Sequence, residues 1–479
     1  MLSNIGEVQE ILPAFGGFKI ITHWRILILL FLAIILPLLL IVYRDQIPLR
    51  KKYKVLLSSI LGICLICEII PNYKFLQLFL QHKDIQKVEG LIFRRYHEEV
   101  PTPLHRFAFS CYSLNQSSRF FENIKRSTLS AQIDSCSYVS PHIVLIIGES
   151  YNKYHSTLYG YKLETTPLQK MHQDEGNLQV FNNVVTPWNI TSNVFLDIFS
   201  MWEYGIEKSI EDIPLFPILF QRAGYSVNFF SNQFLLQGLG KGATNQLGHF
   251  FLADREFSDS LFTFRNRHAC NFDMELVDQV AEFNNQQGSC HYVLDIIHLR
   301  GQHFDYSMRY PQSKTKFYID DYAYRNNKIE EKEILAQYDN ATYYNDMVLD
   351  SILQIYSNKE SIVIFIADHG EEVYDDLPIH GRLFKEPIAK QAQYEYEVPM
   401  WIWYSDSYQQ KHPDITNNIK RSVNKQFMID GLPQILLSLA GISCCWTVET
   451  RNLLSRKYKN RQRIIGGNKD YDELISGVN

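Results

Sequence analysis

The sequence predicts an α/β fold: a layered domain built on a mostly parallel central sheet and preceded by N-terminal transmembrane helices. Three observations predict it. Two long apolar runs lie near the start of the chain. From residue 140 onwards, short apolar runs alternate with longer, helix-like polar stretches. The 479 residues are 46% hydrophobic and 21% charged, which supports a large core and is not typical of a disordered chain.

The two apolar runs predict membrane-spanning helices. The first, 26–43, is interrupted only by Pro37 and has the length of about 18 residues that a bilayer requires. The second, 55–71, is shorter and less purely apolar. The loop between them is basic, which places it on the cytoplasmic side. Residues after about 72 are therefore expected in the periplasm of a two-membrane bacterium, with the chain anchored in the inner membrane.

Composition shifts divide the chain further. We expect a membrane anchor over 1–85, an interfacial linker over 86–137, a periplasmic catalytic domain over 138–460 and a C-terminal tail over 461–479. Cysteines in the outer part can form disulfides in an oxidising compartment. Proximity in sequence makes Cys111–Cys136 and Cys270–Cys290 candidate pairs, but it leaves the connectivity open.

Five short apolar runs predict the strands of the central sheet. Two of them are rich in β-branched residues and do not alternate with polar residues, as in a parallel sheet that is covered on both faces. The five runs are 143–147, 226–230, 292–297, 362–366 and 398–403. Ligands in such domains bind just beyond the carboxyl ends of the strands.

Two of these predicted strands run directly into metal-ligand chemistry. Glu149 follows the strand 143–147, and the pair Asp368 and His369 follows the strand 362–366. A lone acid would be interpreted as a helix cap or a loop carboxylate. The joint occurrence of oxygen and imidazole ligands after buried strands instead predicts a metal site. That ligand set suits Zn²⁺, with Mn²⁺ as the less favoured alternative, and it leaves the number of metals open.

Thr191 is the candidate nucleophile. It precedes a helix-like run at 194–199, and a hydroxyl at a helix N-terminus lies where phosphate binds well. A threonine hydroxyl bound to zinc can ionise near neutral pH and attack phosphorus. Two alternatives compete: Asn189-Ile190-Thr191 fits a glycosylation sequon, and threonine is a good helix N-cap.

Two histidines stand in similar positions after predicted strands. His303 follows the strand 292–297, and His380 lies in the loop after Asp368 and His369. Either can hold a phosphate, transfer protons or bind a second metal. The alternative is a purely structural role, which is the commoner fate of a lone histidine.

Taken together, these residues resemble the phosphoethanolamine transferases of the alkaline phosphatase superfamily, including the enzymes that modify lipid A. The resemblance covers roughly 141–455, and the order and spacing of its motifs make it specific. The motifs are I-I-G-E-S at 146–150, L-Y-G-Y at 158–161, T-T-P at 165–167, F-N-N-V-V-T-P-W-N-I-T-S at 181–192, L-R-G-Q-H-F-D-Y-S-M-R-Y-P at 299–311, A-D-H-G-E-E at 367–372 and I-H-G at 379–381.

The resemblance implies a sulfatase-like fold and roles for individual residues. The zinc ligands would be Glu149, Thr191, Asp368 and His369, one zinc site with a second left open. Thr191 would carry phosphoethanolamine in a ping-pong cycle. Further positions would bind the phosphate or the substrate: His303, His380, Glu371 and Asn232.

The family's donor is phosphatidylethanolamine, and its usual acceptor is a phosphate or sugar of lipid A or of the core oligosaccharide. Both substrates reside in the cell envelope, which explains a catalytic domain tethered to a membrane. Nucleic acid is not an expected partner, because the formal net charge of −5 gives no broad basic field. Neither a P-loop nor a G-x-G-x-x-G turn is present.

The chain departs from the family pattern in two ways. The lipid A enzymes usually carry a cysteine pair that brackets the nucleophile loop, whereas Trp188 and Asp197 occupy that region here. The family also begins with about five membrane helices, of which two are predicted here. The opening residues 3–10 resemble the loop that precedes the family's fourth helix. We therefore expect that the first three helices are missing, through a late start or a real truncation.

Three rival interpretations remain. A sulfatase would need the C-x-P-x-R-type motif that yields formylglycine, which the sequence lacks. A glycerol-phosphate transferase also uses a threonine and a metal and differs in the donor head group. A non-catalytic relative that binds lipid or a partner would have lost metal ligands, and all four are present.

Overall fold

The computed structural model describes residues 73–81, 103–233, 254–266, 268–286, 292–383 and 387–477, and the isolated positions 59, 88, 92 and 252. The chain divides into two compact units. The first comprises 1–83, 100–113 and 238–243, and the second comprises 84–99, 114–237 and 244–479.

Only helical segments are described in the first unit. They are α6 (Tyr73–Gln81) and the opening residues of α8 (Pro103–Leu129). The ring centroids of Phe79 and Tyr112 lie 5.0 Å apart. The predicted membrane spans 26–43 and 55–71 fall outside the described residues, except for position 59. Within the described part of the chain, no helix combines the length and apolarity needed to cross a bilayer.

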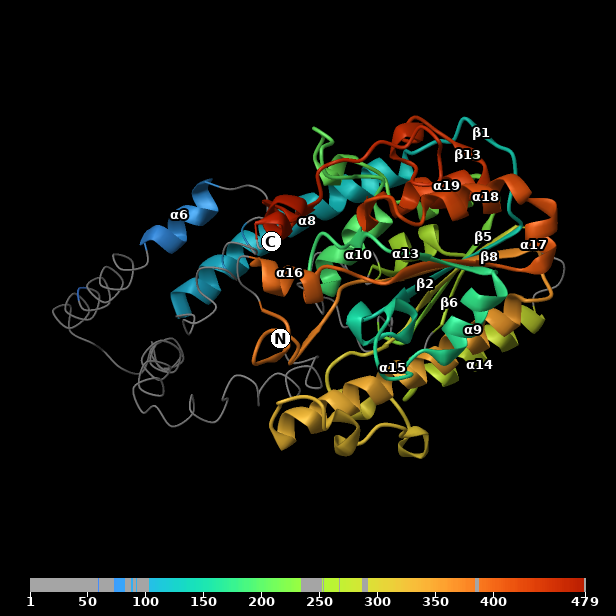
Figure 1. The fold of residues 1–479 in the computed structure, drawn as a ribbon. Helices are drawn as coiled ribbons and strands as arrows, with labels where there is room; N and C mark the ends of the chain where they lie inside the picture. Colours follow the sequence, from blue (N-terminus) through green and yellow to red (C-terminus); the bar gives the residue numbers. More distant parts are fainter. Residues whose placement is uncertain are drawn as a thin grey trace, which may run out of the picture. The chain divides into compact units, whose positions relative to one another are not determined.

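A seven-stranded sheet forms the centre of the second unit, with the strand order β3-β11-β8-β2-β7-β5-β6 (Figure 1). All neighbours from β8 to β6 are parallel, and β11 is antiparallel to both β8 and β3. The strands are β2 (His142–Gly148), β3 (Leu178–Phe181), β5 (Ser226–Ser231), β6 (Phe264–Arg265), β7 (Val293–His298), β8 (Ser361–Ala367) and β11 (Met400–Tyr404).

The predicted mostly parallel sheet is therefore confirmed, and each of the five predicted strands is found within a few residues of its expected bounds. β3 and β6 were not predicted, because four residues and two residues are too short to show a pattern. The isolated antiparallel strand β11 makes the sheet mixed.

Helices cover both faces of the sheet, which explains the continuous apolar runs of β2 and β8 (Figure 1). One face carries α10 (Thr191–Phe199) and α19 (Leu432–Ala440). The other carries α9 (Pro167–Glu175), α14 (Asp273–Gln286) and α15 (Ile329–Tyr356). The side chains of β8 are buried along its whole length.

The register of the sheet brings the ends of its two central strands together. Gly148 at the end of β2 pairs with Ala367 at the end of β8. Both strands point the same way, so the residues that follow them emerge side by side at one edge of the sheet.

The last part of the chain belongs to the second unit and packs within it. It contains the short strands β14 (Ile464–Ile465) and β15 (Lys469–Asp470) and the helix α20 (Tyr471–Ser476). Ile465 and Tyr471 join a buried cluster with Val185. Up to residue 477, the segment predicted as a tail is thus ordered on the domain, and the domain boundaries as a whole stay a prediction.

The candidate disulfides do not form in the structure. Cys136 and Cys270 are both free thiols. Cys136 Sγ lies 3.6 Å from the carbonyl oxygen of Ala440. Cys270 Sγ accepts a hydrogen bond from the side-chain amide of Gln279 at 3.0 Å. Proximity in sequence was therefore a poor guide to the partners of these two thiols.

Candidate active site

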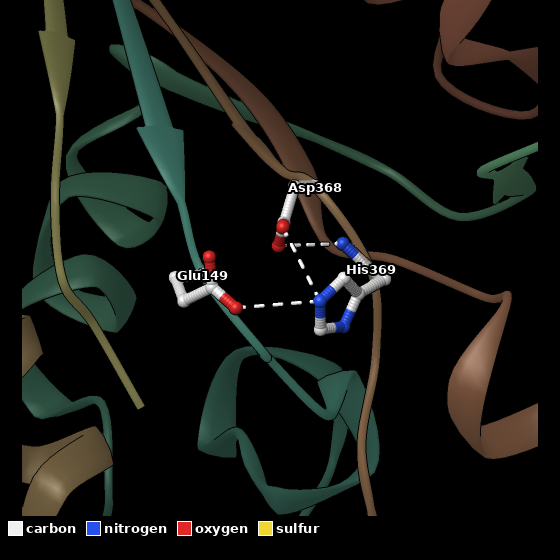
Figure 2. Close-up of side chains that lie close together, drawn as sticks. All are labelled: Glu149, Asp368 and His369. Carbon is white, nitrogen blue, oxygen red and sulfur yellow. Dashed lines mark hydrogen bonds and ion pairs between the residues drawn. The ribbon is translucent and has the colours of Figure 1, made fainter. Parts of the chain in front are cut away.

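The four predicted metal ligands meet at the carboxyl edge of the sheet. Glu149 follows β2, Asp368 and His369 follow β8, and Thr191 is the first residue of α10. Glu149, Asp368 and His369 are completely buried. Each of these three offers one ligand atom, and those atoms all lie within 4.8 Å of one another (Figure 2).

His369 Nε2 lies at the centre of this group. It is 3.3 Å from Glu149 Oε1 and 3.3 Å from Asp368 Oδ2. The hydroxyl oxygen of Thr191 lies 3.2 Å from His369 Nε2 and 3.2 Å from Glu149 Oε2. Residues that are up to 220 positions apart in the sequence are thus within contact distance of one hydroxyl group.

The imidazole of His369 is held in the state that a metal ligand needs. Its Nδ1 lies 2.8 Å from the carbonyl oxygen of Gly370, which fixes the proton on Nδ1 and leaves the lone pair of Nε2 facing Glu149 and Asp368. Burial lowers the pKa of His369 to about 4, and the charge of Arg382 adds to this while Glu149 opposes it. The ring is therefore neutral at physiological pH.

Asp368 shows that this group of residues fits a cation. Its Oδ1 accepts hydrogen bonds from the backbone N–H groups of Ser150 and His369, at 3.1 and 2.7 Å. Its Oδ2 is buried and has no hydrogen-bond partner. Burial, followed by the charge of Glu149, raises the pKa of Asp368 well above its usual value. An orphaned carboxylate oxygen opposite an imidazole lone pair is the arrangement that a zinc ion would satisfy.

Arg382 is a site residue that sequence reasoning missed. Its Nη1 lies 2.7 Å from His369 Nε2 and donates to the carbonyl oxygen of Asn189 at 3.1 Å. Its Nε lies 3.4 Å from Glu371 Oε2. Arg382 follows the I-H-G motif directly, but no residue pattern distinguishes it from any other loop arginine.

Glu371 lies behind the arginine. Its side chain is buried and accepts a 2.7 Å hydrogen bond from the hydroxyl of Tyr306. Burial raises its pKa to about 7, although the charge of Arg382 acts in the opposite direction. Glu371 contacts Tyr306 and Arg382. The substrate-binding role predicted for Glu371 would therefore consist of holding Arg382 in place.

Asn232 was expected to bind substrate, but it is the neighbouring Gln233 that contacts Glu149. Both amide atoms of Asn232 are engaged, one with Asp273 Oδ1 at 2.9 Å and the other with the backbone N–H of Cys270 at 2.7 Å. The neighbouring Gln233 instead donates to Glu149 Oε2 at 3.0 Å. Substrate binding by Asn232 stays a prediction, and Gln233 is the residue that contacts a candidate ligand.

The two predicted histidines are both half-buried. His303 Nδ1 lies 2.6 Å from the carbonyl oxygen of Phe304. His380 Nδ1 lies 2.9 Å from the hydroxyl of Tyr374, and its ring stacks on Phe304 with centroids 5.7 Å apart. Burial lowers the pKa of His380. These contacts of His380 involve aromatic neighbours, and its role at the phosphate stays a prediction.

The fold agrees with the comparisons to known proteins. The model of the sulfatase family matches residues 141–442. That is more than half of the chain and spans the sheet together with all four candidate ligands, so the protein belongs to the sulfatase family.

Within that family the chain is similar to phosphoethanolamine transferases. It is 29% identical over 350 residues to phosphoethanolamine transferase EptC of Escherichia coli K12, covering 70% of this chain and 58% of that protein. It is 26% identical over 418 residues to phosphoethanolamine transferase CptA of Salmonella typhimurium LT2, covering 83% of this chain and 69% of that protein. The chain thus spans less than two thirds of EptC.

Among solved structures, the C-terminal periplasmic domain of EptC from Escherichia coli, determined as a complex with zinc, superposes with a TM-score of 0.62. The two sequences are 27% identical, and the match covers 72% of this chain and 98% of that domain. The zinc belongs to that relative, and the donor set described above gives an independent reason to expect a metal here.

Proposed function

We propose that this protein is a zinc-dependent phosphoethanolamine transferase with Thr191 as its nucleophile. The observation that carries the proposal is the position of the Thr191 hydroxyl, 3.2 Å from both His369 Nε2 and Glu149 Oε2, beside the orphaned Asp368 Oδ2. A hydroxyl placed among candidate metal ligands is suited to nucleophilic attack.

Zinc would be held by Glu149, Thr191, Asp368 and His369. When bound, it supplies the positive charge that lowers the pKa of the threonine hydroxyl and stabilises negative charge on phosphorus oxygens. The protein's own residues then determine geometry. Ser150 and Gln233 fix Glu149 through hydrogen bonds of 2.8 and 3.0 Å, so the carboxylate cannot rotate away.

We infer a reaction of two transfers. Thr191 Oγ1 attacks the phosphorus of phosphatidylethanolamine, and the bond from phosphorus to the diacylglycerol oxygen breaks while that oxygen takes up a proton. An acceptor hydroxyl or protonated phosphate oxygen then attacks the phosphorus, the bond from phosphorus to Thr191 Oγ1 breaks, and the proton of the acceptor passes to Thr191 Oγ1. The helix α10 begins at Thr191 without a side-chain cap, and the N–H of Asn193 already donates to the carbonyl oxygen of Ile190. The N–H groups of Thr191 and Ser192 are therefore the ones that would reach phosphoryl oxygens.

Arg382, His303 and His380 complete the proposed site. The guanidinium of Arg382 would neutralise phosphoryl oxygens once a metal has taken the lone pair of His369. His303 and His380 would hold the phosphate or donate the proton to the leaving oxygen.

The acceptor we propose is lipid A or another lipopolysaccharide component of the cell envelope. Support comes from the names of relatives, among which is Kdo(2)-lipid A phosphoethanolamine 7''-transferase of Escherichia coli K12. A lipid donor and a glycolipid acceptor are consistent with a catalytic domain in the periplasm that is anchored to the inner membrane by the runs 26–43 and 55–71.

Intact mass spectrometry tests the donor and the nucleophile together. The protein is incubated with zinc and phosphatidylethanolamine and compared with Thr191→Ala and with the control Ser192→Ala, which removes the neighbouring hydroxyl. We expect a phosphoethanolamine adduct on the wild type and on Ser192→Ala, mapped to Thr191, and none on Thr191→Ala. An adduct that persists in Thr191→Ala would rule out this nucleophile. Absence of any adduct with zinc bound would contradict the donor.

A further inference from the structure

A buried hydrogen bond joins the two sides of the segment that carries Thr191. Trp188 Nε1 donates to Asp197 Oδ2 at 2.9 Å. Trp188 lies in the loop before α10, and Asp197 lies within the helix. Both residues are buried, with 9% and 2% of their surface exposed. The bond therefore closes a short ring of chain in which Thr191 is enclosed.

Removing either partner of this hydrogen bond would leave the other buried without its partner. An indole N–H is only a donor, and a buried donor that is left without an acceptor is destabilising. Burial and the charge of Asp430 raise the pKa of Asp197 well above its usual value, and the hydrogen bond from Trp188 acts against this shift. The pair is thus mutually dependent, as expected of a contact that specifies one loop conformation.

The indole is also held from its other side by the C-terminal segment. The backbone N–H of Gly466 donates to the carbonyl oxygen of Pro187 at 2.8 Å. A Cβ atom added to Gly467 would lie 2.9 Å from Cη2 of Trp188, which is closer than real contacts allow. The absence of a side chain at 467 is therefore what lets this segment pack against the indole.

Other residues of the loop before Thr191 also make hydrogen bonds. Thr186 Oγ1 donates to the carbonyl oxygen of Trp188 at 3.1 Å, and Asn189 Nδ2 donates to Glu395 Oε2 at 2.6 Å. Among these contacts, only that between Trp188 and Asp197 connects the loop to the helix that Thr191 begins. Backbone hydrogen bonds from the N–H groups of Asn193 and Val194 to the carbonyl oxygen of Ile190 also join the loop to the helix. The bond between Trp188 and Asp197 is the side-chain contact that adds to them in positioning the threonine hydroxyl.

We propose that Trp188 and Asp197 are positioning residues, whose hydrogen bond helps to hold Thr191 against Glu149 and His369. This inference rests on the proposed function, in which Thr191 is the nucleophile. A displacement of about 1 Å at a reacting atom costs on the order of 100-fold in rate. The bond therefore sets both the rate at which Thr191 is modified and the affinity for zinc that Thr191 contributes.

The test compares variants that remove the bond with variants that keep it. Trp188→Phe removes the donor and keeps a ring, and Asp197→Leu removes the acceptor at similar volume. Asp197→Asn retains an oxygen that can accept. Trp202→Phe is the matched control, because its indole N–H donates to the carbonyl oxygen of Lys208 outside the ring. Each protein is assayed for the rate of Thr191 modification, the zinc dissociation constant by chelator competition, and Tm.

We expect Trp188→Phe and Asp197→Leu each to slow modification of Thr191 roughly 10- to 100-fold. Both variants should also raise the zinc dissociation constant, and by the same factor. The double variant should be no worse than either single variant, because both remove the same contact. Asp197→Asn and Trp202→Phe should stay close to wild type. Additive losses, or a fall in Tm with rate and zinc affinity unchanged, would overturn the proposal.

A second pair of variants tests the same proposal even if a variant that removes the hydrogen bond fails to fold. Gly467→Ala should displace the indole and reproduce the phenotype of Trp188→Phe. Its control is Gly176→Ala, because Gly176 has φ +87° against +85° at Gly467, and a Cβ there meets nothing within 4 Å. Equal effects of the two alanines would show that backbone strain alone is responsible, and would overturn the role of Trp188.

The zinc measurement separates this inference from the proposed function. If the wild type forms no adduct but zinc affinity follows the pattern above, the donor or the nucleophile is wrong and the positioning role stands. If the adduct forms on Thr191 and the variants change neither rate nor affinity, the positioning role is wrong and the proposed function stands.

Discussion

Arg382 Nη1 lies 2.7 Å from His369 Nε2, the ring nitrogen that faces Glu149 and Asp368. The guanidinium and a metal ion would therefore compete for the same lone pair. Arg382 also contacts Glu371 and the backbone of Asn189, so it remains anchored in the site when that lone pair is taken. This one contact distinguishes the role of the arginine from those of the metal ligands.

Replacing Arg382 is expected to separate metal binding from catalysis. Arg382→Ala should bind zinc at least as tightly as wild type, because a competitor for Nε2 is gone. It should slow phosphoryl transfer roughly 100-fold, as expected for loss of a group that stabilises developing negative charge. His369→Ala should instead lose zinc. Chelator competition and single-turnover kinetics measure the two quantities, and a loss of zinc from Arg382→Ala as large as that from His369→Ala would refute the assignment.

Asp368 should make the stability of the protein depend on zinc. In the wild type, zinc should raise Tm, because it binds the folded state only and satisfies the buried Oδ2. Asp368→Asn removes the buried charge together with a ligand, so its Tm without zinc should be no lower than that of wild type and should not respond to added zinc. Differential scanning calorimetry with and without chelator checks this. An equal zinc-induced rise in both proteins would exclude Asp368 as a ligand.

His155 should contribute stability that is lost at high pH. It is buried between Asp339 and Asp375, with ring nitrogens 2.6 Å and 3.2 Å from their carboxylates. Burial by itself lowers its pKa, but these two charges outweigh burial and raise the pKa to about 10. Since an unfolded histidine titrates near 6.5, this stability is fully present below about pH 6.5 and is lost as pH rises through about 10.

His155→Gln should therefore cost about 3–5 kcal/mol at pH 6, as for a buried ion pair deprived of one partner. The difference from wild type should shrink towards pH 10. Urea unfolding at a series of pH values measures it, with the exposed His268→Gln as control. A difference that is constant from pH 6 to pH 10 would show that His155 carries no charge in the folded protein.

Glu203 should also make stability fall as pH rises, but over a lower pH range and because its charged form is the one that burial disfavours. It is buried and neither of its oxygens has a hydrogen-bond partner, although Arg461 lies 3.5 Å away. Burial raises its pKa to about 7, with the charge of Arg461 acting against it. The folded state therefore holds a proton that the unfolded state has released, and stability falls as pH rises from about 4.5 to 7. Glu203→Gln should be more stable than wild type at pH 8, with little difference at pH 4.5, as measured by thermal unfolding. A wild type that is the more stable of the two at pH 8 would contradict this.

Much of the fold could be predicted from the sequence. The strands around 143–147 and 362–366 were visible because burial on both faces leaves a continuous apolar run. The same runs placed Glu149, Asp368 and His369 at their ends, and parallel strands bring such ends to one edge. β3 and β6 were missed because they are too short to carry a pattern. The course of the chain over 461–477 was missed because that stretch is mostly polar.

The sequence by itself determined the kind and order of the candidate ligands, because both follow from local runs and motifs. Only the tertiary structure decided which side chains face one another. Arg382 reaches His369, Gln233 rather than Asn232 reaches Glu149, and Trp188 meets Asp197. Such contacts depend on the direction in which each loop leaves the sheet. That direction is set by packing among distant segments, and no local residue pattern records it.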